Sequence, residues 1–202
     1  QLITSPGAIG PGCPPLSELA SLDFSADARL LYDQQNIQGG YSASQHAAHY
    51  LIYFTVQNLN PANAGYGDYL WFGLALYDDR DPMPGLSVSG DDFTAKLIYN
   101  IGLQPLSSAS LDDNQWHGLS EDLLPHVRTA VKEAWARGYL ADSRVLSDYT
   151  LGGMNLGWEV PGLNNVELQL DDLSLTYSER VAAEIRYDFY TDGDTEGWTA
   201  SN

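Results

Sequence analysis

The sequence predicts an all-β fold, a β-sandwich with one inserted α-helix. Three features support this prediction: short stretches of alternating apolar and polar residues, frequent Gly, Pro and Asn turns between them, and one stretch with helical periodicity. The chain has 202 residues, of which 44% are hydrophobic, so it is long enough to bury a sizeable core. Several short strands with a single helix are typical of a sandwich.

The two ends of the chain differ in composition from its centre. Residues 1–17 are rich in Pro and Gly and are expected to form an extended leader. The sandwich is predicted over residues 18–178, beginning with one or two short strands before Gly39 and Gly40. Residues 179–202 are interpreted as a linker and the start of a further module.

The clearest strands are predicted in the first half of the domain. Residues 50–57 alternate strictly between an apolar row and a second row that contains Tyr53 and Gln57. Residues 92–101 are predicted as a further strand, with Phe93 in its apolar row and Asn100 in the opposite row.

Residues 69–77 form the strand that first indicates a binding surface. One of its rows is apolar, and the other places Trp71 and Tyr77 at the two ends with Gly73 and Ala75 between them. Two aromatic side chains separated by two very small ones predict a shallow trough.

One helix is predicted at residues 125–137. Pro125 suits a first helical turn, Glu133 and Arg137 are an i,i+4 ion pair, and Gly138 is a natural stop. Its apolar residues recur at helical spacing and predict one buried stripe.

The last strands are predicted over residues 146–160 and 166–177. The apolar parity of the second changes between Leu170 and Leu173, which predicts a β-bulge at Asp171 and Asp172.

Charge and cysteine content exclude several function classes. The net charge is -18, from 27 acidic and 9 basic residues, and this field repels nucleic acids and anionic membranes. No apolar run approaches the roughly 18 to 20 residues of a membrane span. Cys13 is the one cysteine, so no intramolecular disulfide and no cysteine-based zinc cluster is expected.

Several short motifs together resemble a carbohydrate-binding-module-like jelly-roll domain of secreted bacterial multi-domain proteins. The motifs are Tyr69 to Leu74 (YLWFGL), the Trp116-His117 pair, Gly157-Trp158-Glu159, and Leu170 to Leu175 (LDDLSL). Residues 188–202 (DFYTDGDTEGWTASN) look like the opening strand of a further such module. The resemblance implies a jelly-roll sandwich, a secreted or cell-surface location, and neighbouring modules in the same parent chain.

The predicted function is therefore non-catalytic binding of a polysaccharide or oligosaccharide. Aromatic rings stack on the apolar faces of sugars, while amide and charged groups bond the hydroxyls. The ligand-binding residues that we predict are Trp71, Tyr77, Tyr53, Gln57, Asn100, Gln169 and Arg80.

A structural calcium ion is the one cofactor expected. In domains of the resembled type the last strand often carries an acidic pair that shares a calcium ion with the first strand. The residues that match are Asp171 and Asp172, with Asp23 on the first strand. Carboxylate oxygens are the ligands that calcium prefers.

Two alternative functions remain open from the sequence. The first is a jelly-roll glycoside hydrolase or polysaccharide lyase. A hydrolase would need a pair of acidic residues, for which Glu159 and Glu167 are the candidates. A lyase would need a tyrosine with a histidine or an arginine, for which His49-Tyr50 and Arg80 are the candidates. A structural or adhesion module would bind no glycan and would use an apolar patch or a strand edge for assembly.

Overall fold

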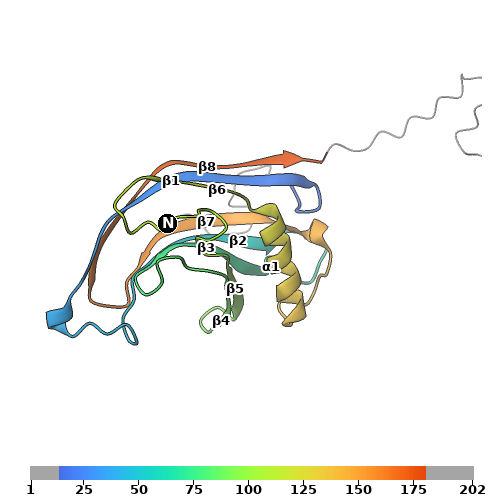
Figure 1. Ribbon diagram of the computed structural model, residues 1–202. Helices are drawn as coiled ribbons and strands as arrows, with labels where there is room; N and C mark the ends of the chain where they lie inside the picture. Colours follow the sequence, from blue (N-terminus) through green and yellow to red (C-terminus); the bar gives the residue numbers. More distant parts are fainter. Residues whose placement is uncertain (1–13, 181–202) are drawn as a thin grey trace, which may run out of the picture.

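The computed structural model describes residues 14–180 and shows two β-sheets packed face to face (Figure 1). The upper sheet in Figure 1 has the strand order β6-β1-β8 and the lower sheet the order β4-β5-β3-β2-β7. This arrangement confirms the predicted fold class, an all-β sandwich of jelly-roll type with one inserted helix. No helix among the described residues has both the length and the hydropathy of a membrane span.

The strands of the two sheets and the helices have the following bounds. The three-stranded sheet contains β1 (Leu19–Gln35), β6 (His117–Asp122) and β8 (Asn164–Glu179). The five-stranded sheet contains β2 (His49–Asn58), β3 (Tyr69–Asp78), β4 (Ser87–Asp91), β5 (Lys96–Asn100) and β7 (Tyr149–Glu159). The helices are α1 (Leu124–Ala136) and the short 3-10 helices η1 (Ile37–Gly39) and η2 (Leu146–Asp148).

The core lies between the sheets and is built by strand alternation. Phe24 of β1, Phe54 of β2 and Phe72 of β3 are each almost fully buried there, with the aliphatic residues two positions away on the same strands. Because successive side chains of a strand point to opposite faces, the other rows of β2 and β3 lie on the outer face of the five-stranded sheet.

Helix α1 closes one end of the sandwich (Figure 1). It buries Val127, Val131 and their helical neighbours, as the periodicity predicts. The Glu133–Arg137 pair forms, with Arg137 Nε 2.7 Å from Glu133 Oε1, and Gly138 ends the helix with a φ of +86°.

Two strand predictions need correction. The first strand is one long element, β1, rather than one or two short ones. The strand expected over residues 92–101 is shorter, because β4 and β5 form a hairpin whose turn includes Phe93 and Ala95. Ala95 has a φ of +55°, which no regular strand accommodates.

The bulge predicted at Asp171 and Asp172 is present. Between the pairs Ser25↔Ser174 and Asp27↔Asp171, strand β8 carries one residue more than β1. Asp172 has a φ of +48°, and its N–H is bonded to the Asp171 side chain at 2.9 Å.

The packed part of the chain extends to residues before the predicted start at residue 18. Leu16 is fully buried, and its N–H donates to the carbonyl of Tyr149.

Candidate functional site

The outer face of the five-stranded sheet carries a trough that runs across the strands. Its floor is a row of residues on three neighbouring strands. Leu51 of β2 is paired there with Ala75 of β3 and with Gly157 of β7. Leu51 and Ala75 are themselves buried, at 5% and 8% exposure, so they lie below their surroundings. We call this feature the trough.

One side of the trough is an aromatic wall formed by Tyr53 and Trp71. Tyr53 is the next outward residue after Leu51 on β2, and Trp71 lies on β3 beside Thr55. The two rings meet edge to face with centroids 6.0 Å apart, and Tyr69 packs in the same way on Trp71 at 5.3 Å. Edge-to-face contact is a favourable geometry for aromatic pairs, so the three rings stabilise one another's positions.

The position of the Tyr53 ring depends on its two neighbours. A Cβ atom on Gly73 would lie 2.5 Å from the Tyr53 ring, so glycine is required where this ring lies flat on β3. Burial raises the pKa of Tyr53 to about 12, and the charge of Glu159 adds to the rise, whereas a hydrogen bond with Asn100 opposes it. The Tyr53 hydroxyl is therefore protonated at neutral pH and up to strongly alkaline pH.

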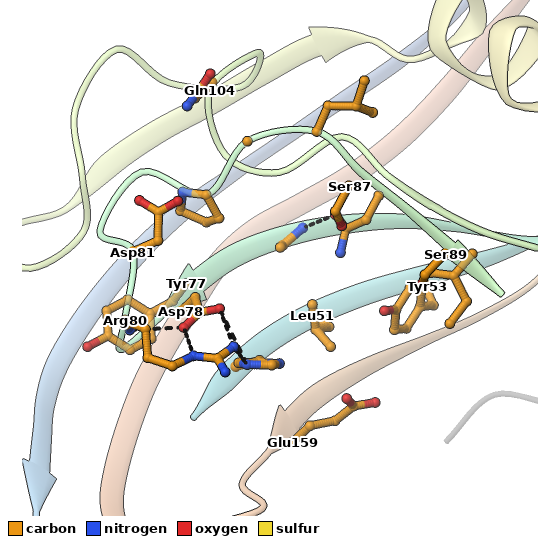
Figure 2. Close-up of a pocket in the computed structure, with 17 residues that line it drawn as sticks. Leu51, Tyr53, Tyr77, Asp78, Arg80, Asp81, Ser87, Ser89, Gln104 and Glu159 are labelled. Atoms are coloured by element: carbon orange, nitrogen blue, oxygen red, sulfur yellow. Dashed lines mark hydrogen bonds and ion pairs between the residues drawn. The ribbon is translucent and has the colours of Figure 1, made fainter. Parts of the chain in front are cut away.

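The opposite side of the trough is an ionic wall. His49 of β2 is paired with Asp78 at the end of β3 and with Glu159 at the end of β7. These three residues face the same side as Leu51 and Tyr53, and four strand residues separate the two walls by about 13 Å. Figure 2 shows Leu51 between Tyr53 and the Asp78–Arg80 group.

Arg80 holds the ionic wall together. Its Nε is 2.9 Å from Asp78 Oδ1, and its terminal nitrogen lies 2.8 Å from Asp78 Oδ2 and 2.6 Å from Nε2 of His49 (Figure 2). Because guanidinium only donates, His49 accepts this bond through Nε2 as a neutral ring. Burial raises the pKa of Asp78, but the hydrogen bonds from Arg80 and its charge outweigh it and leave the pKa below its usual range.

Three hollows join into one continuous site along this face. Their volumes are about 670, 180 and 400 Å³, and Tyr53 and Glu159 line all three. The largest lies over the ionic wall and the third lies over the aromatic wall. The largest and the third are each in the size range of ligand clefts, about 300–1,000 Å³.

The structure brings some of the predicted binding residues together and separates others. The predicted residues that line the hollows are Trp71, Tyr53, Asn100, Arg80 and Tyr77. Asn100 also has a structural role, because its side-chain oxygen accepts the N–H groups of Ala75 at 2.9 Å and Gly102 at 3.1 Å.

Tyr77 borders the largest hollow, but it does not lie in the outward row of β3 with Trp71 as the alternation predicts. The pairing jumps from Tyr50↔Tyr77 to Leu51↔Ala75, so β3 carries one extra residue, Leu76. The extra residue turns Tyr77 toward the core side with Tyr50 and puts Asp78 on the trough face. Tyr77 is 7% exposed, and its hydroxyl donates to Asp33 of β1 at 2.9 Å.

Two predicted amides also lie elsewhere. Gln57 is 1% exposed, and a Cβ atom on Gly152 of β7 would lie 2.6 Å from its side chain, so it is covered rather than open to a ligand. Gln169 belongs to β8 and is paired with Arg29, which places it in the other sheet. Strand alternation gives the face of each residue but not the sheet to which its strand belongs.

The two acids named for catalysis are separated in the same way. Glu159 lines the trough, but Glu167 of β8 lies opposite Tyr32 of β1 in the three-stranded sheet. A hydrogen bond from Tyr32 to Glu167 raises the pKa of that tyrosine. Glu159 and Glu167 cannot act on one sugar.

The predicted calcium ligands do not converge. Asp171 lies opposite Asp27 of β1, whereas Asp23 lies opposite Thr176 and Asp122. Four strand residues separate Asp23 from Asp27, a distance of about 13 Å. Within residues 14–180 no group of three His, Cys, Asp or Glu residues is placed to hold a metal ion.

The trough also contains residues that the sequence did not predict to bind a glycan. They are His49, Asp78, Asn155, Ser87, Ser89, Gln104 and Phe93. Ser87 and Ser89 were missed because their strand, β4, is short and lacks the apolar row by which strands are predicted. The segment 188–202 and Cys13 lie outside the described residues.

Comparisons with known proteins give likenesses of fold only. Neither a protein-family model nor a curated protein sequence matches the chain. Among solved structures, endoglucanase Cel12A from Rhodothermus marinus is 14% identical, with a TM-score of 0.46 over 84% of this chain and 67% of that one. A metagenome-derived glycoside hydrolase family 12 endoglucanase is 15% identical, with a TM-score of 0.45 over 85% of this chain and 67% of that one.

A third similar structure was determined with a sugar. It is the xyloglucanase domain of NopAA, a type three effector from Sinorhizobium fredii, in complex with cellobiose. It is 8% identical, with a TM-score of 0.41, and the match covers 83% of this chain and 72% of that one. At these scores the function of the present chain has to be inferred from its own trough.

Proposed function

We propose that the trough binds a neutral polysaccharide or oligosaccharide, as one module of a secreted or cell-surface protein. The observation that carries the proposal is that the aromatic wall and the ionic wall face each other across a shallow floor. A sugar ring has an apolar face of C–H groups and a rim of hydroxyls. The aromatic wall of Tyr53 and Trp71 suits the face, and the polar side chains opposite suit the rim.

The charge of the trough favours an uncharged glycan. Arg80 is the one arginine or lysine that lines the three hollows within residues 14–180, and its guanidinium is already bonded to Asp78 and His49. The carboxylates of Asp78, Asp81 and Glu159 line the same hollow. An acidic glycan would be repelled by these groups and by the net charge of -18.

Removal of the aromatic wall tests the proposal. We expect Trp71→Ala to weaken retention in affinity electrophoresis about tenfold or more on the polysaccharide that the unchanged protein binds. Trp116→Ala is the matched control, because Trp116 is 46% exposed and lies next to β6 in the other sheet. Equal retention of both variants would refute the site. No retention of any glycan in a broad panel would favour a structural module.

Hydrolysis is a second candidate function, and one observation favours it. Asp78 and Glu159 both lie opposite His49, on strands about 10 Å apart with β2 between them. Inverting glycosidases hold their two carboxyl groups about 6.5–9.5 Å apart. Asp78, with its lowered pKa, would be the base that activates water, and Glu159 would be the acid that protonates the leaving oxygen.

Release of reducing ends separates this candidate from simple binding. If the pair is catalytic, Glu159→Gln and Asp78→Asn each stop product release while retention persists. Retention by the unchanged protein without any released ends over a long incubation supports the binding function alone.

A further inference from the structure

Phe93 is the most exposed large apolar side chain among the described residues. It is 100% exposed at the tip of the β4–β5 hairpin, although a phenylalanine gains about 1.5–3 kcal/mol from burial. Turn tips are ordinarily occupied by Gly, Pro, Asn, Asp or Ser. The fold obtains nothing from the Phe93 ring, so its presence there points to a contact outside the fold.

The turn that carries Phe93 is held by hydrogen bonds to Asp91. The Asp91 side chain accepts the N–H of Phe93 at 3.0 Å and the hydroxyl of Thr94, and the Asp91 carbonyl accepts the N–H of Ala95 at 2.8 Å. These bonds fix the backbone of the tip and therefore the direction in which the ring extends.

That direction is toward the aromatic end of the trough. Phe93 lines the hollow of about 400 Å³ whose other walls include Trp71, Tyr53 and Ile98. The remaining lining residues are Asp91, Asn155 and Glu159, which supply hydrogen-bonding groups at the edge. The hollow is thus bounded by aromatic rings from the sheet and from the hairpin.

Strand β5 joins the hairpin to the sheet, and Lys96 at the start of β5 adds an ion pair with Asp68 and lies over the Tyr69 ring. Strand β5 is paired with β3 at three positions, Trp71↔Ile98, Phe72↔Tyr99 and Gly73↔Asn100, and β4 is paired with β5 alone. The residues from 91 to 96 extend beyond this ladder, as the free lower end of β4 and β5 in Figure 1 shows. The hairpin therefore holds Phe93 beyond the ladder, beside the aromatic wall.

We propose that Phe93 is a second stacking platform and that the β4–β5 hairpin clamps one sugar ring of the bound chain between Phe93 and the aromatic wall. The proposal rests on the glycan-binding function. It adds that the ring held there is contacted on both of its faces, so this position takes an unbranched unit without a bulky substituent. A substituent on either face would hold the clamp open.

A set of variants at position 93 tests the clamp by calorimetry, with an unbranched oligosaccharide cut from the polysaccharide that the protein retains. We expect Phe93→Ala to weaken binding about tenfold and Phe93→Trp to restore it, because each good aromatic contact corresponds to a few-fold to tenfold change in affinity. Phe93→Leu keeps apolar cover without a flat ring and should resemble Phe93→Ala. Folding is not at risk, because the side chain is fully exposed.

The outcomes distinguish the clamp from the binding function. If Phe93→Ala binds like the unchanged protein while Trp71→Ala does not, the clamp is wrong and the binding function stands. Full binding by Phe93→Leu also overturns stacking, and so does a change of oligomeric state in light scattering on Phe93→Ala, which would assign the ring to self-association. If the unchanged protein binds no glycan, both proposals fail.

Discussion

The phenol of Tyr53 reports on the trough because its surroundings are set by a single glycine. Burial raises the pKa of Tyr53 to about 12 from the ordinary value of 10.0. The pKa of Tyr41 is also raised to about 12, so we expect an ultraviolet titration to show phenols that ionise near this value and one fewer of them in Tyr53→Phe. Gly73→Ala would push the Tyr53 ring outward, since the added Cβ would lie 2.5 Å from it, and should move its ionisation toward 10.0.

The same shift makes stability depend on alkaline pH. The unfolded chain releases the Tyr53 proton near 10.0, whereas the folded chain keeps it until about 12, so rising pH favours unfolding between these values. Urea unfolding of the unchanged protein should show a larger loss of stability from about pH 9 to about pH 11 than Tyr53→Phe does. Identical losses would mean that the ring is open to solvent.

The hydroxyl of Tyr77 stabilises the fold rather than a ligand. It joins β3 to Asp33 of β1 at 2.9 Å and thus links the two sheets. Tyr77→Phe keeps the ring against Trp158 but removes this bond to a carboxylate, so we expect a loss of about 2 kcal/mol in urea unfolding with glycan affinity unchanged. Tyr66→Phe, at a residue that is 53% exposed, is the control and should be neutral. A loss of affinity with stability intact would return Tyr77 to the trough.

At the scale of single elements, the two bulges show what alternation can and cannot predict. The bulge in β8 was predictable because it shifts the parity between Leu170 and Leu173 across two polar residues. The bulge in β3 was not, because Leu76 and Tyr77 are both apolar and no polar residue marks the slip. The extra residue in β3 therefore places Asp78, rather than Tyr77, in the outward row of the strand.

The end of helix α1 gives a prediction about backbone alone. Gly138 has a φ of +86°, and a Cβ atom added there would meet nothing within 4 Å, so Gly138→Ala tests conformational strain without a clash. We expect a loss of about 1 kcal/mol in urea unfolding. Gly118→Ala in β6 is the matched control, because its added Cβ would lie at an ordinary 3.6 Å from Asp27 and its φ is not positive. Similar effects at the two sites would argue against the left-handed end of the helix.

For the whole molecule, the sequence predicted the layers but not the sheet to which each strand belongs. Strands β2 and β3, helix α1 and the sandwich follow from local periodicity. The location of Gln169 and Glu167 in the other sheet does not, because it depends on which strands pair at a distance in sequence. Trp71 and Tyr53 come together because their strands are adjacent, whereas the prediction of three converging acids required a register that local sequence does not set.

The net charge of -18 controls the stability of the whole molecule through ionic strength. Carboxylates outnumber basic groups 27 to 9, so charge repulsion opposes the compact state, and screening lengths fall from about 30 Å at 10 mM salt to about 10 Å at 0.1 M. We expect the melting temperature to rise by several degrees, on the order of 5 °C, between about 10 mM and about 0.5 M sodium chloride. Because Asp23 is not placed beside Asp171 and Asp172, calcium chloride at matched ionic strength should give the same melting temperature as sodium chloride. A further rise with calcium that is lost in Asp171→Asn would show that a calcium ion does bind the bulge, and the ladder between β1 and β8 would then have to rearrange to supply its ligands.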